Sequence, residues 1–232
     1  MLTKEPGNYP SNSQGMSSEL INKAANYIKI KTFGEPTGHD WFHTERVWKI
    51  ASHIQSKEGG DLEKIELLAL LHDIGDTINY ELEKQKGPLV LRGMMDILDI
   101  PKQQQDELIK IILEIKYKGD DHVPPISLEA KIVQDADFLD SLGAVGIARI
   151  FATGGSIKRM IYNPAQKPRK KLTREDNIYR KQDGTSVNYF YEKTLRLPAI
   201  INTATAKKIA LERAQFTEDF IKQFLKDWQG KN

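Results

Sequence analysis

Apolar residues recur every three or four positions along most of this chain, which is the spacing of one face of an α-helix. We find no sustained strand-like alternation and no internal repeat. The sequence therefore predicts an all-α fold, a bundle of helices with one long irregular interruption. The predicted helices cover about 18–32, 40–57, 62–73, 85–98, 102–117, a long helix that begins after Ser127, 187–196 and 199–228.

The interruption runs from Thr153 to Ser186, where glycines and prolines replace the periodic pattern. A loop of this length in a compact domain is usually functional or disordered. Two interpretations stay open: a solvated charged loop, or a lid whose cations meet a polyphosphate. The cations in question are Lys167, Arg169, Lys170, Lys171, Arg174, Arg180 and Lys181.

Length and composition are those of a single globular domain. The chain has 232 residues, a formal net charge of +2 and no cysteine. We expect residues 1–16 to be a disordered lead-in and residues 17–232 to form one domain. The small net charge predicts no general attraction to nucleic acid or anionic membranes. The polar start lacks the apolar core of a secretory signal, and no apolar stretch approaches the roughly 20 residues of a membrane span, so we expect a cytoplasmic protein.

His72 and Asp73 stand at the end of an apolar run, Leu67 to Leu71. Such a run predicts a buried helix, and burying ionisable groups is costly unless they are paired or bound to metal. Adjacent residues on a helix do not face each other, so the two do not simply neutralise one another. A metal ion beside them could accept a nitrogen from one and an oxygen from the other. The alternative is a histidine that ends a core helix, next to a solvated aspartate.

His43 and Asp137 add two more candidates for the same site. His43 shares a helix face with Val47, Ile50 and Ile54, which predicts that it points into the core. Asp137 lies on a face with Val133, one turn before it, and that face extends to Ala144 and Ile147. Three helices would then each offer a buried ligand of the kind that metals prefer.

The predicted ligand set is therefore His43, His72, Asp73 and Asp137. Two imidazoles and two carboxylates suit Mn²⁺, Fe²⁺, Co²⁺, Ni²⁺, Zn²⁺ or Mg²⁺. We expect one divalent ion, with Mn²⁺ favoured. Around an octahedral ion, four protein ligands would leave two positions for water or a phosphate oxygen.

The order of these four residues resembles that of the HD-domain metal-dependent phosphohydrolases. The segment 38–43, Gly-His-Asp-Trp-Phe-His, followed by Arg46 and Val47, is similar to the opening motif of one bacterial branch, and 135–144 with 146–149 is similar to its closing motif. Segments 189–193 and 202–206 also fit, so the resemblance covers roughly residues 18–229. It implies an HD-type helical bundle and a phosphohydrolase activity.

The resemblance also points to a single metal. Relatives with two metals usually place two further histidines between the His-Asp pair and the last aspartate, and here only His122 lies in that interval. Two positions depart from the branch. Phe138 stands where the closing motif often has arginine, and 114–117, Glu-Ile-Lys-Tyr, stands where many relatives carry a histidine.

Two acidic residues are candidates for the chemical step. Asp76 is three residues after Asp73, on the same side if the helix continues, and resembles the acid found at that offset in single-metal relatives. It could orient or deprotonate the attacking water. The alternative is a helix-capping aspartate beside Thr77. Glu81 is a weaker candidate for a second acid.

Two cations are candidates for binding the substrate. Arg46, one turn after His43, could hold a phosphate through two hydrogen bonds. Its alternative role is a structural ion pair with a neighbour such as Asp140. Lys193 could neutralise phosphate charge, or it could simply be a solvated lysine.

These assignments predict a metal-dependent phosphohydrolase that acts on a nucleotide or another small phosphorylated metabolite. Nucleoside triphosphate pyrophosphohydrolase activity is the preferred version. The alternatives are a nucleoside monophosphate phosphatase, an iron-dependent oxygenase of the same fold, and a nucleotide-binding regulatory protein with a relic metal site. The two-iron oxygenase needs the extra histidines that this chain lacks. We expect a small phosphorylated partner, with no membrane or nucleic acid; a homodimer stays open.

Overall fold

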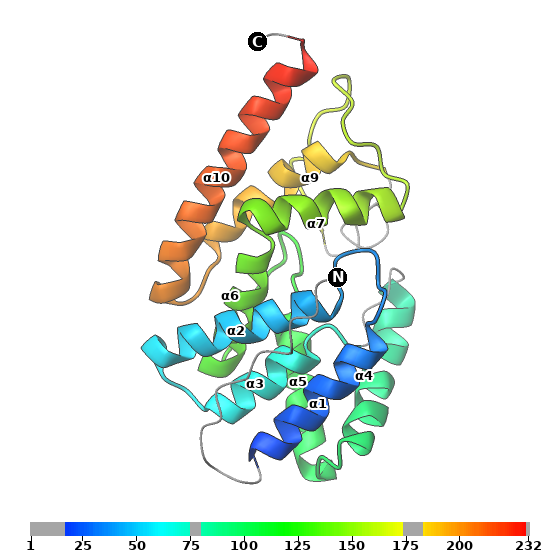
Figure 1. Ribbon diagram of the computed structural model, residues 1–232, viewed down its shortest axis with the longest axis vertical. Coiled ribbons are helices and arrows are strands. Elements are labelled where there is room, and N and C mark those ends of the chain that lie inside the picture. Colours follow the sequence, from blue (N-terminus) through cyan, green and yellow to red (C-terminus); the bar gives the residue numbers. More distant parts are fainter. Residues whose placement is uncertain (1–16, 75–79, 174–182, 231–232) are drawn as a thin grey trace, which may run out of the picture.

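The computed structural model describes residues 17–74, 80–173 and 183–230. The lead-in expected at 1–16 lies outside these ranges. The described part of the chain contains helices and no strand, apart from two isolated bridges, so the expected all-α fold is confirmed (Figure 1). The elements are α1 (Ser17–Lys31), α2 (Trp41–Glu58), α3 (Leu62–Leu71), α4 (Tyr80–Ile97), α5 (Lys102–Ile115), α6 (Leu128–Asp140), α7 (Gly143–Ser156), α9 (Ser186–Glu192), the 3₁₀ helix η1 (Thr194–Ala199) and α10 (Ala204–Trp228).

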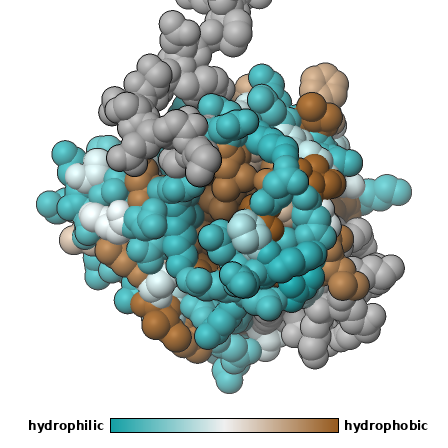
Figure 2. Space-filling model, turned by 90° about the horizontal axis from the view of Figure 1, so that it is seen from below, coloured by the Kyte–Doolittle hydropathy of each residue, from teal (hydrophilic) through white to brown (hydrophobic). Residues whose placement is uncertain are grey.

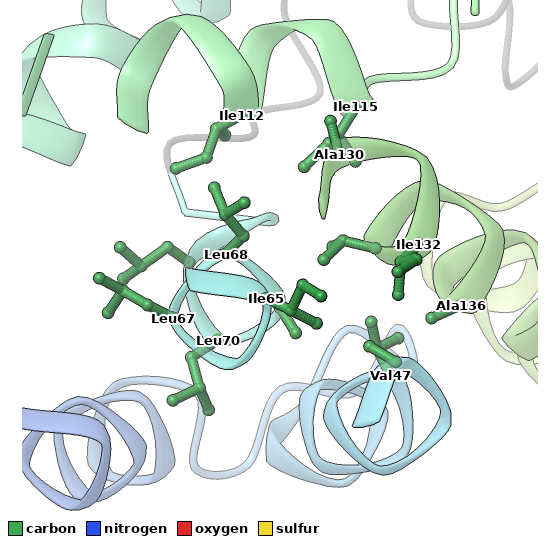
Figure 3. Packing of buried hydrophobic residues seen from close by; sticks show 14 of the residues in the cluster. Val47, Ile65, Leu67, Leu68, Leu70, Ile112, Ile115, Ala130, Ile132 and Ala136 are labelled. Atoms are coloured by element: carbon green, nitrogen blue, oxygen red, sulfur yellow. The ribbon is translucent and has the colours of Figure 1, made fainter. Parts of the chain in front are cut away.

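Helix α3 forms the centre of the main core. Ile65, Leu68 and Leu71 are completely buried, and Leu67 and Leu70 nearly so. Figure 3 shows side chains of α2, α5 and α6 around it. A helix that is apolar on all sides is stable only when neighbours cover every side, which is why the Leu67–Leu71 run lies here. The end of α3 and His72 are therefore fixed in the interior, and Asp73 lies beside them with its side chain 26% exposed.

A second, smaller core lies among α7, α9 and α10, in the upper part of Figure 1. Its buried members are Ile147, Ile150, Phe190 and Ile221. This core corrects the expectation that the helix face of Asp137 runs on to Ile147. Helix α6 ends at Asp140, and the chain turns before α7 carries Ile147 into the second core.

The turn between α6 and α7 depends on a glycine. Gly143 has φ +71°, a left-handed conformation that side chains with a Cβ rarely adopt. Arg213 of α10 packs over this glycine and donates to the carbonyl oxygen of Leu139 at 2.6 Å. The end of α6 is thereby held in place, together with the acidic residues on its last turns.

The C-terminal elements begin and end at other residues than the sequence predicted. Instead of helices at 187–196 and 199–228, the chain forms α9, η1 and then α10 from Ala204. Asp135, fully buried on α6, accepts hydrogen bonds from the backbone and side chain of both Asn202 and Thr203, at 2.7–2.8 Å. Thr203 in turn caps α10 by accepting from the amide of Ala206. A buried carboxylate thus sets the start of the last helix.

The buried face of α10 also differs from the expected apolar stripe. That stripe was Ile200, Ile209, Phe216, Phe220 and Phe224, but Phe216 is 54% exposed. The residues that face the core are mostly small: Ala206, Ala210, Ala214, Thr217 and Ile221. Phe216 lies off this face, because it comes one residue before Thr217, about 100° around the helix.

The irregular segment is tied to the helices at several points. Thr153–Ser156 complete α7, and 157–173 and 183–185 are irregular apart from the bridges at Met160 and Thr173. The carboxylate of Glu192, which is 2% exposed, accepts three hydrogen bonds from Arg169 at 2.8–3.0 Å. Arg169 is therefore a structural anchor.

The surface carries dispersed apolar side chains. Seen from below, the molecule is largely hydrophilic, with hydrophobic residues in separate groups (Figure 2). Exposed examples are Ile30 and Phe33 near the end of α1 and Trp228 on α10. Single exposed apolar residues are ordinary on folded proteins. None of the described helices combines the length and apolar character needed to cross a lipid bilayer.

The role of Asp135 leads to a stability prediction. Asp135→Ala removes the acceptor of four hydrogen bonds and leaves buried amides unsatisfied, so we expect a loss of about 3 kcal/mol in the free energy of unfolding. For a chain of this size that corresponds to a fall in Tm of about 6–12 °C. Asp121→Ala, at an exposed aspartate, is the matched control and should change Tm little. Equal melting curves for the two variants would contradict the account.

Candidate metal centre

His43 is placed by the first turn of α2. Asp40 caps this helix by accepting from the amide of His43 at 3.0 Å, and the His43 side chain is completely buried. Its ring nitrogen Nδ1 lies 2.7 Å from Oδ2 of Asp140. Because a carboxylate only accepts, Nδ1 carries a proton. The other ring nitrogen, Nε2, faces the interior of the site.

His72 is placed just beyond α3, which ends at Leu71 rather than at residue 73. Its Nδ1 lies 2.7 Å from the carbonyl oxygen of Ala69, so this nitrogen must also donate, and Nε2 again faces the site. The ammonium of Lys116 donates to the carbonyl oxygen of His72 at 2.6 Å. This contact holds the turn that follows α3 against the end of α5.

The structure brings together all four side chains that the sequence singled out as ligands. Nε2 of His43 lies 3.3 Å from Nε2 of His72 and 3.1 Å from Oδ2 of Asp73. Nε2 of His72 lies 3.3 Å from Oδ1 of Asp73. Oδ1 of Asp137 is slightly further, 3.7 Å from His43 and 4.0 Å from His72, and the Asp137 side chain is 28% exposed rather than buried as predicted. His43, His72 and Asp73 each present an atom within 4.8 Å of the others, so these three form a group that could hold an ion.

These residues fit a divalent cation chemically. With both Nδ1 atoms donating, the neutral rings turn two lone pairs toward each other, which is unfavourable unless a proton or a cation lies between them. Oδ2 of Asp73 is buried and has no aligned hydrogen bond within the described part of the chain. Ligands of one ion at about 2.1 Å lie about 3 Å apart when they are neighbours in its coordination shell, close to the spacing seen here.

The electrostatics of the cluster also favour a cation at this place. Burial and Arg149 lower the pKa of His43, but hydrogen bonds to Asp140 and Asp73 outweigh them and raise it to about 9. Burial raises the pKa of Asp73, but the charges of His72 and Lys116 and the contact with His43 hold it well below its usual range. Without metal, a proton therefore occupies His43 at neutral pH. Metal binding must release that proton.

Arg46 lies beside the cluster but uses two of its donors on a protein partner. Its Nε and Nη2 donate to the two oxygens of Asp140, at 2.6 and 3.0 Å. Arg149 of α7 donates to the same carboxylate at 3.0 Å. The two arginines line a shallow groove between the start of α2 and α7. The other residues that line it are Gly38, Asp40, Ala144, Val145, Ala148 and Ala152.

Lys193 follows α9 and is held by aromatic rings. Its ammonium lies 4.9 Å from the ring centre of Tyr117 and 5.7 Å from that of Tyr189. Burial lowers its pKa, but Tyr189 and the nearby charge of Asp137 outweigh burial, so the net pKa is raised. Lys193 is therefore a fixed positive charge on the Asp137 side of the cluster.

The end of α5 supplies residues that the sequence did not single out as functional. Helix α5 ends at Ile115, so Lys116 reaches His72 and Tyr117 lies under Lys193. Phe138, at the position where related motifs often have arginine, is buried and packs edge-on to Tyr117 with ring centres 5.9 Å apart. The apolar spacing of α5 gave no signal for these contacts, since they depend on where the helix stops.

The two candidate acids are not placed by the structure. Asp76 lies outside the described residues, and the helix on which its position was predicted ends before His72. Glu81 belongs to α4, but its side chain is also outside what the structure describes.

Comparison with known proteins agrees with this geometry. Residues 41–142 match the HD domain family. A crystal structure from Lactobacillus plantarum is 34% identical, with 92% of this chain and 98% of that chain covered and a TM-score of 0.81. An HD-superfamily hydrolase from Bacillus thuringiensis is 36% identical, with 93% and 100% covered and a TM-score of 0.67.

YpgQ from Bacillus subtilis is a further relative. It is 34% identical over 203 residues, which are 84% of this chain and 87% of YpgQ. A crystal structure of YpgQ in complex with ADP superposes with a TM-score of 0.68 at 31% identity, covering 91% of this chain and 96% of that chain.

The cluster leads to a prediction about metal binding. Asp73→Ala removes a charged ligand next to both imidazoles, so we expect the purified variant to lose stoichiometric Mn²⁺, measured by elemental analysis after dialysis and by titration calorimetry. His53→Ala, at an exposed histidine of α2, is the control and should bind as the wild type does. An Asp73→Ala protein with full metal content would remove Asp73 from the site.

Proposed function

This chain belongs to the HD-domain family of metal-dependent phosphohydrolases, and we propose that it hydrolyses nucleoside triphosphates between the α- and β-phosphates, releasing pyrophosphate. The observation that carries this proposal is the convergence of His43, His72, Asp73 and Asp137 next to a fixed ammonium group. The ADP complex of YpgQ supports a nucleotide as the ligand.

Members of this family bind divalent metals, and we propose that Mn²⁺ is held here by His43, His72, Asp73 and Asp137. A bound ion of this kind polarises a phosphoryl oxygen and makes bound water acidic enough to attack near neutral pH. The protein's own part is to present both Nε2 atoms to the ion. The Nδ1 contacts of His43 and His72 hold one proton on each Nδ1, so Nε2 is the nitrogen that can bind the ion once the second proton of His43 has been released.

We assign the binding of the phosphate chain to Lys193. Its ammonium is confined between Tyr117 and Tyr189 and lies near Asp137, so little freedom is lost when a phosphate oxygen meets it. Lys116 adds a second positive charge beside His72. Two fixed cations next to a metal suit a substrate with several negative charges better than a monoester.

The remaining sequence candidates keep their proposed roles with different support. We retain Asp76 as the group that orients or deprotonates the attacking water, with Glu81 as the second choice, on the resemblance alone. Arg46 has two donors committed to Asp140, which leaves less of it for direct phosphate binding. A lid role of the irregular segment would fall to its other cations, since Arg169 is held by Glu192. Of these, Lys167, Lys170 and Lys171 are among the described residues, and Arg174, Arg180 and Lys181 lie outside them.

Product analysis tests the proposed reaction. Purified protein, stripped of metal and reloaded with Mn²⁺, Co²⁺, Mg²⁺ or Zn²⁺, is given a panel of nucleoside tri-, di- and monophosphates. We expect pyrophosphate and the nucleoside monophosphate in equal amounts from triphosphates, with Mn²⁺ the best metal.

Other outcomes of this assay have defined meanings. Orthophosphate from monophosphates would replace the proposal with a nucleotidase. Binding of nucleotides without turnover under any metal would favour a regulatory protein. The Asp73→Ala protein serves as the inactive control, because contaminating phosphatases would remain in its preparation.

A further inference from the structure

Asp140 is a buried carboxylate that the proposed chemistry does not use directly. It lies on the last turn of α6, one turn after Asp137, and is 1% exposed. Three side chains from two other helices donate to it: His43 and Arg46 from α2, and Arg149 from α7. Burying a carboxylate costs desolvation free energy, and four hydrogen bonds are needed to offset it here.

The contact with His43 decides which ring nitrogen can bind a metal. Oδ2 of Asp140 lies 2.7 Å from Nδ1, and the oxygen can only accept. The proton of the neutral ring must then stay on Nδ1, and the lone pair on Nε2. That Nε2 is the atom 3.1 Å from Asp73 and 3.3 Å from Nε2 of His72.

The two arginines fix the carboxylate in turn. Arg46 makes a two-point contact, from Nε to Oδ1 and from Nη2 to Oδ2, so the plane of the carboxylate is set. Arg149 donates to Oδ2 of Asp140. It also donates to the carbonyl oxygen of Gly38, a residue just before α2, at 2.8 Å. Rotation of Asp140 away from His43 would break contacts to both arginines.

We propose that Asp140 is the positioning residue of the metal centre: it fixes the ring and tautomer of His43, the two-point contact of Arg46 holds the carboxylate in place for this role, and Arg149 ties the same carboxylate to α7. This inference rests on the proposed assignment of His43 as a metal ligand. It gives Arg46 a task other than binding the substrate, and it accounts for the direction of both arginines toward the end of α6. A carboxylate that orients a ligating histidine typically changes metal affinity about 10–100-fold when it is altered.

The competing possibility is that these four residues form only a structural cluster that joins α2, α6 and α7. A structural cluster and a positioning residue both affect stability, so stability alone does not separate them. They differ in what happens to the metal when one arginine is removed. In a positioning arrangement, Asp140 stays oriented by the two-point contact of Arg46 even without Arg149.

Asp140→Asn and Arg149→Met are the decisive pair of variants. In the asparagine variant, the amide oxygen should take the place of Oδ2, where three donors meet, and the amide nitrogen should then oppose Nε of Arg46. The His43 contact becomes neutral and the two-point contact is lost. We expect Mn²⁺ to bind to Asp140→Asn about 10–100-fold more weakly than to the wild type, measured by titration calorimetry.

For Arg149→Met we expect a lower Tm but a Kd for Mn²⁺ within about threefold of wild type, since the His43–Asp140 contact remains.

Co²⁺ absorption gives a readout that a structural role would not change. The visible bands of bound Co²⁺ report the ligand geometry, so they should shift in Asp140→Asn and match the wild type in Arg149→Met. If Asp140→Asn does not fold, Arg46→Lys is the substitute, because it keeps the charge but has no two-point contact. It should weaken Mn²⁺ binding several-fold, and wild-type affinity in that variant would overturn the proposal.

His43→Ala separates failure of this inference from failure of the proposed metal site. If His43→Ala abolishes Mn²⁺ binding and folded Asp140→Asn keeps wild-type affinity and the same Co²⁺ spectrum, the positioning role is overturned and the ligand assignment stands. If His43→Ala itself keeps wild-type affinity, both are overturned. Equal losses of Mn²⁺ affinity in Asp140→Asn and Arg149→Met would also overturn the positioning role. They would favour the purely structural cluster.

Discussion

The buried contact between His43 and His72 is the constraint on which the rest of the site depends. Both rings donate from Nδ1, to Asp140 and to the carbonyl of Ala69, and so both turn Nε2 into the same space, 3.3 Å apart. In a buried, weakly solvated position this arrangement requires positive charge between the rings. A proton supplies that charge in the metal-free protein, and a divalent ion can replace it with two carboxylates at hand. The chemistry proposed for this protein follows from that exchange.

The fold provides the constraint by burying the second half of α3, Leu67 to Leu71, on every side. Because α2, α5 and α6 all pack against α3, the end of α3 meets the start of α2 and the last turns of α6. Each of these three places contributes candidate ligands. The end of α5 contributes Lys116 and Tyr117 to the same region, and the turn after α9 contributes Lys193. Since the candidate ligands lie on or next to helices that form the main core, changes in core packing should alter the geometry of the candidate metal site.

Helical periodicity was sufficient to predict which side chains meet at the candidate site, because a histidine or aspartate is costly on an apolar face unless it has a partner or a metal. His43 and Asp137 were found in this way, and the all-α fold followed from the same pattern.

What periodicity missed depends on contacts between residues distant in sequence. The end of α3 at Leu71 is accompanied by a contact from Lys116, and the start of α10 is held by Asp135, two residues before the aspartate that the pattern singled out. Phe216 was predicted to be a core residue but is exposed, because the buried face of α10 runs through Ala214 and Thr217 instead. For Arg46 the sequence left two roles open, and the side chain is found paired with Asp140.

Anomalous diffraction from crystals grown with Mn²⁺ tests the central claim most directly. The account predicts one strong peak at the manganese edge, bonded to Nε2 of both His43 and His72 and to carboxylate oxygens of Asp73 and Asp137, with the Nδ1 contacts to Asp140 and Ala69 retained. A peak elsewhere, or no peak while the four side chains stay hydrogen-bonded to one another, would contradict it.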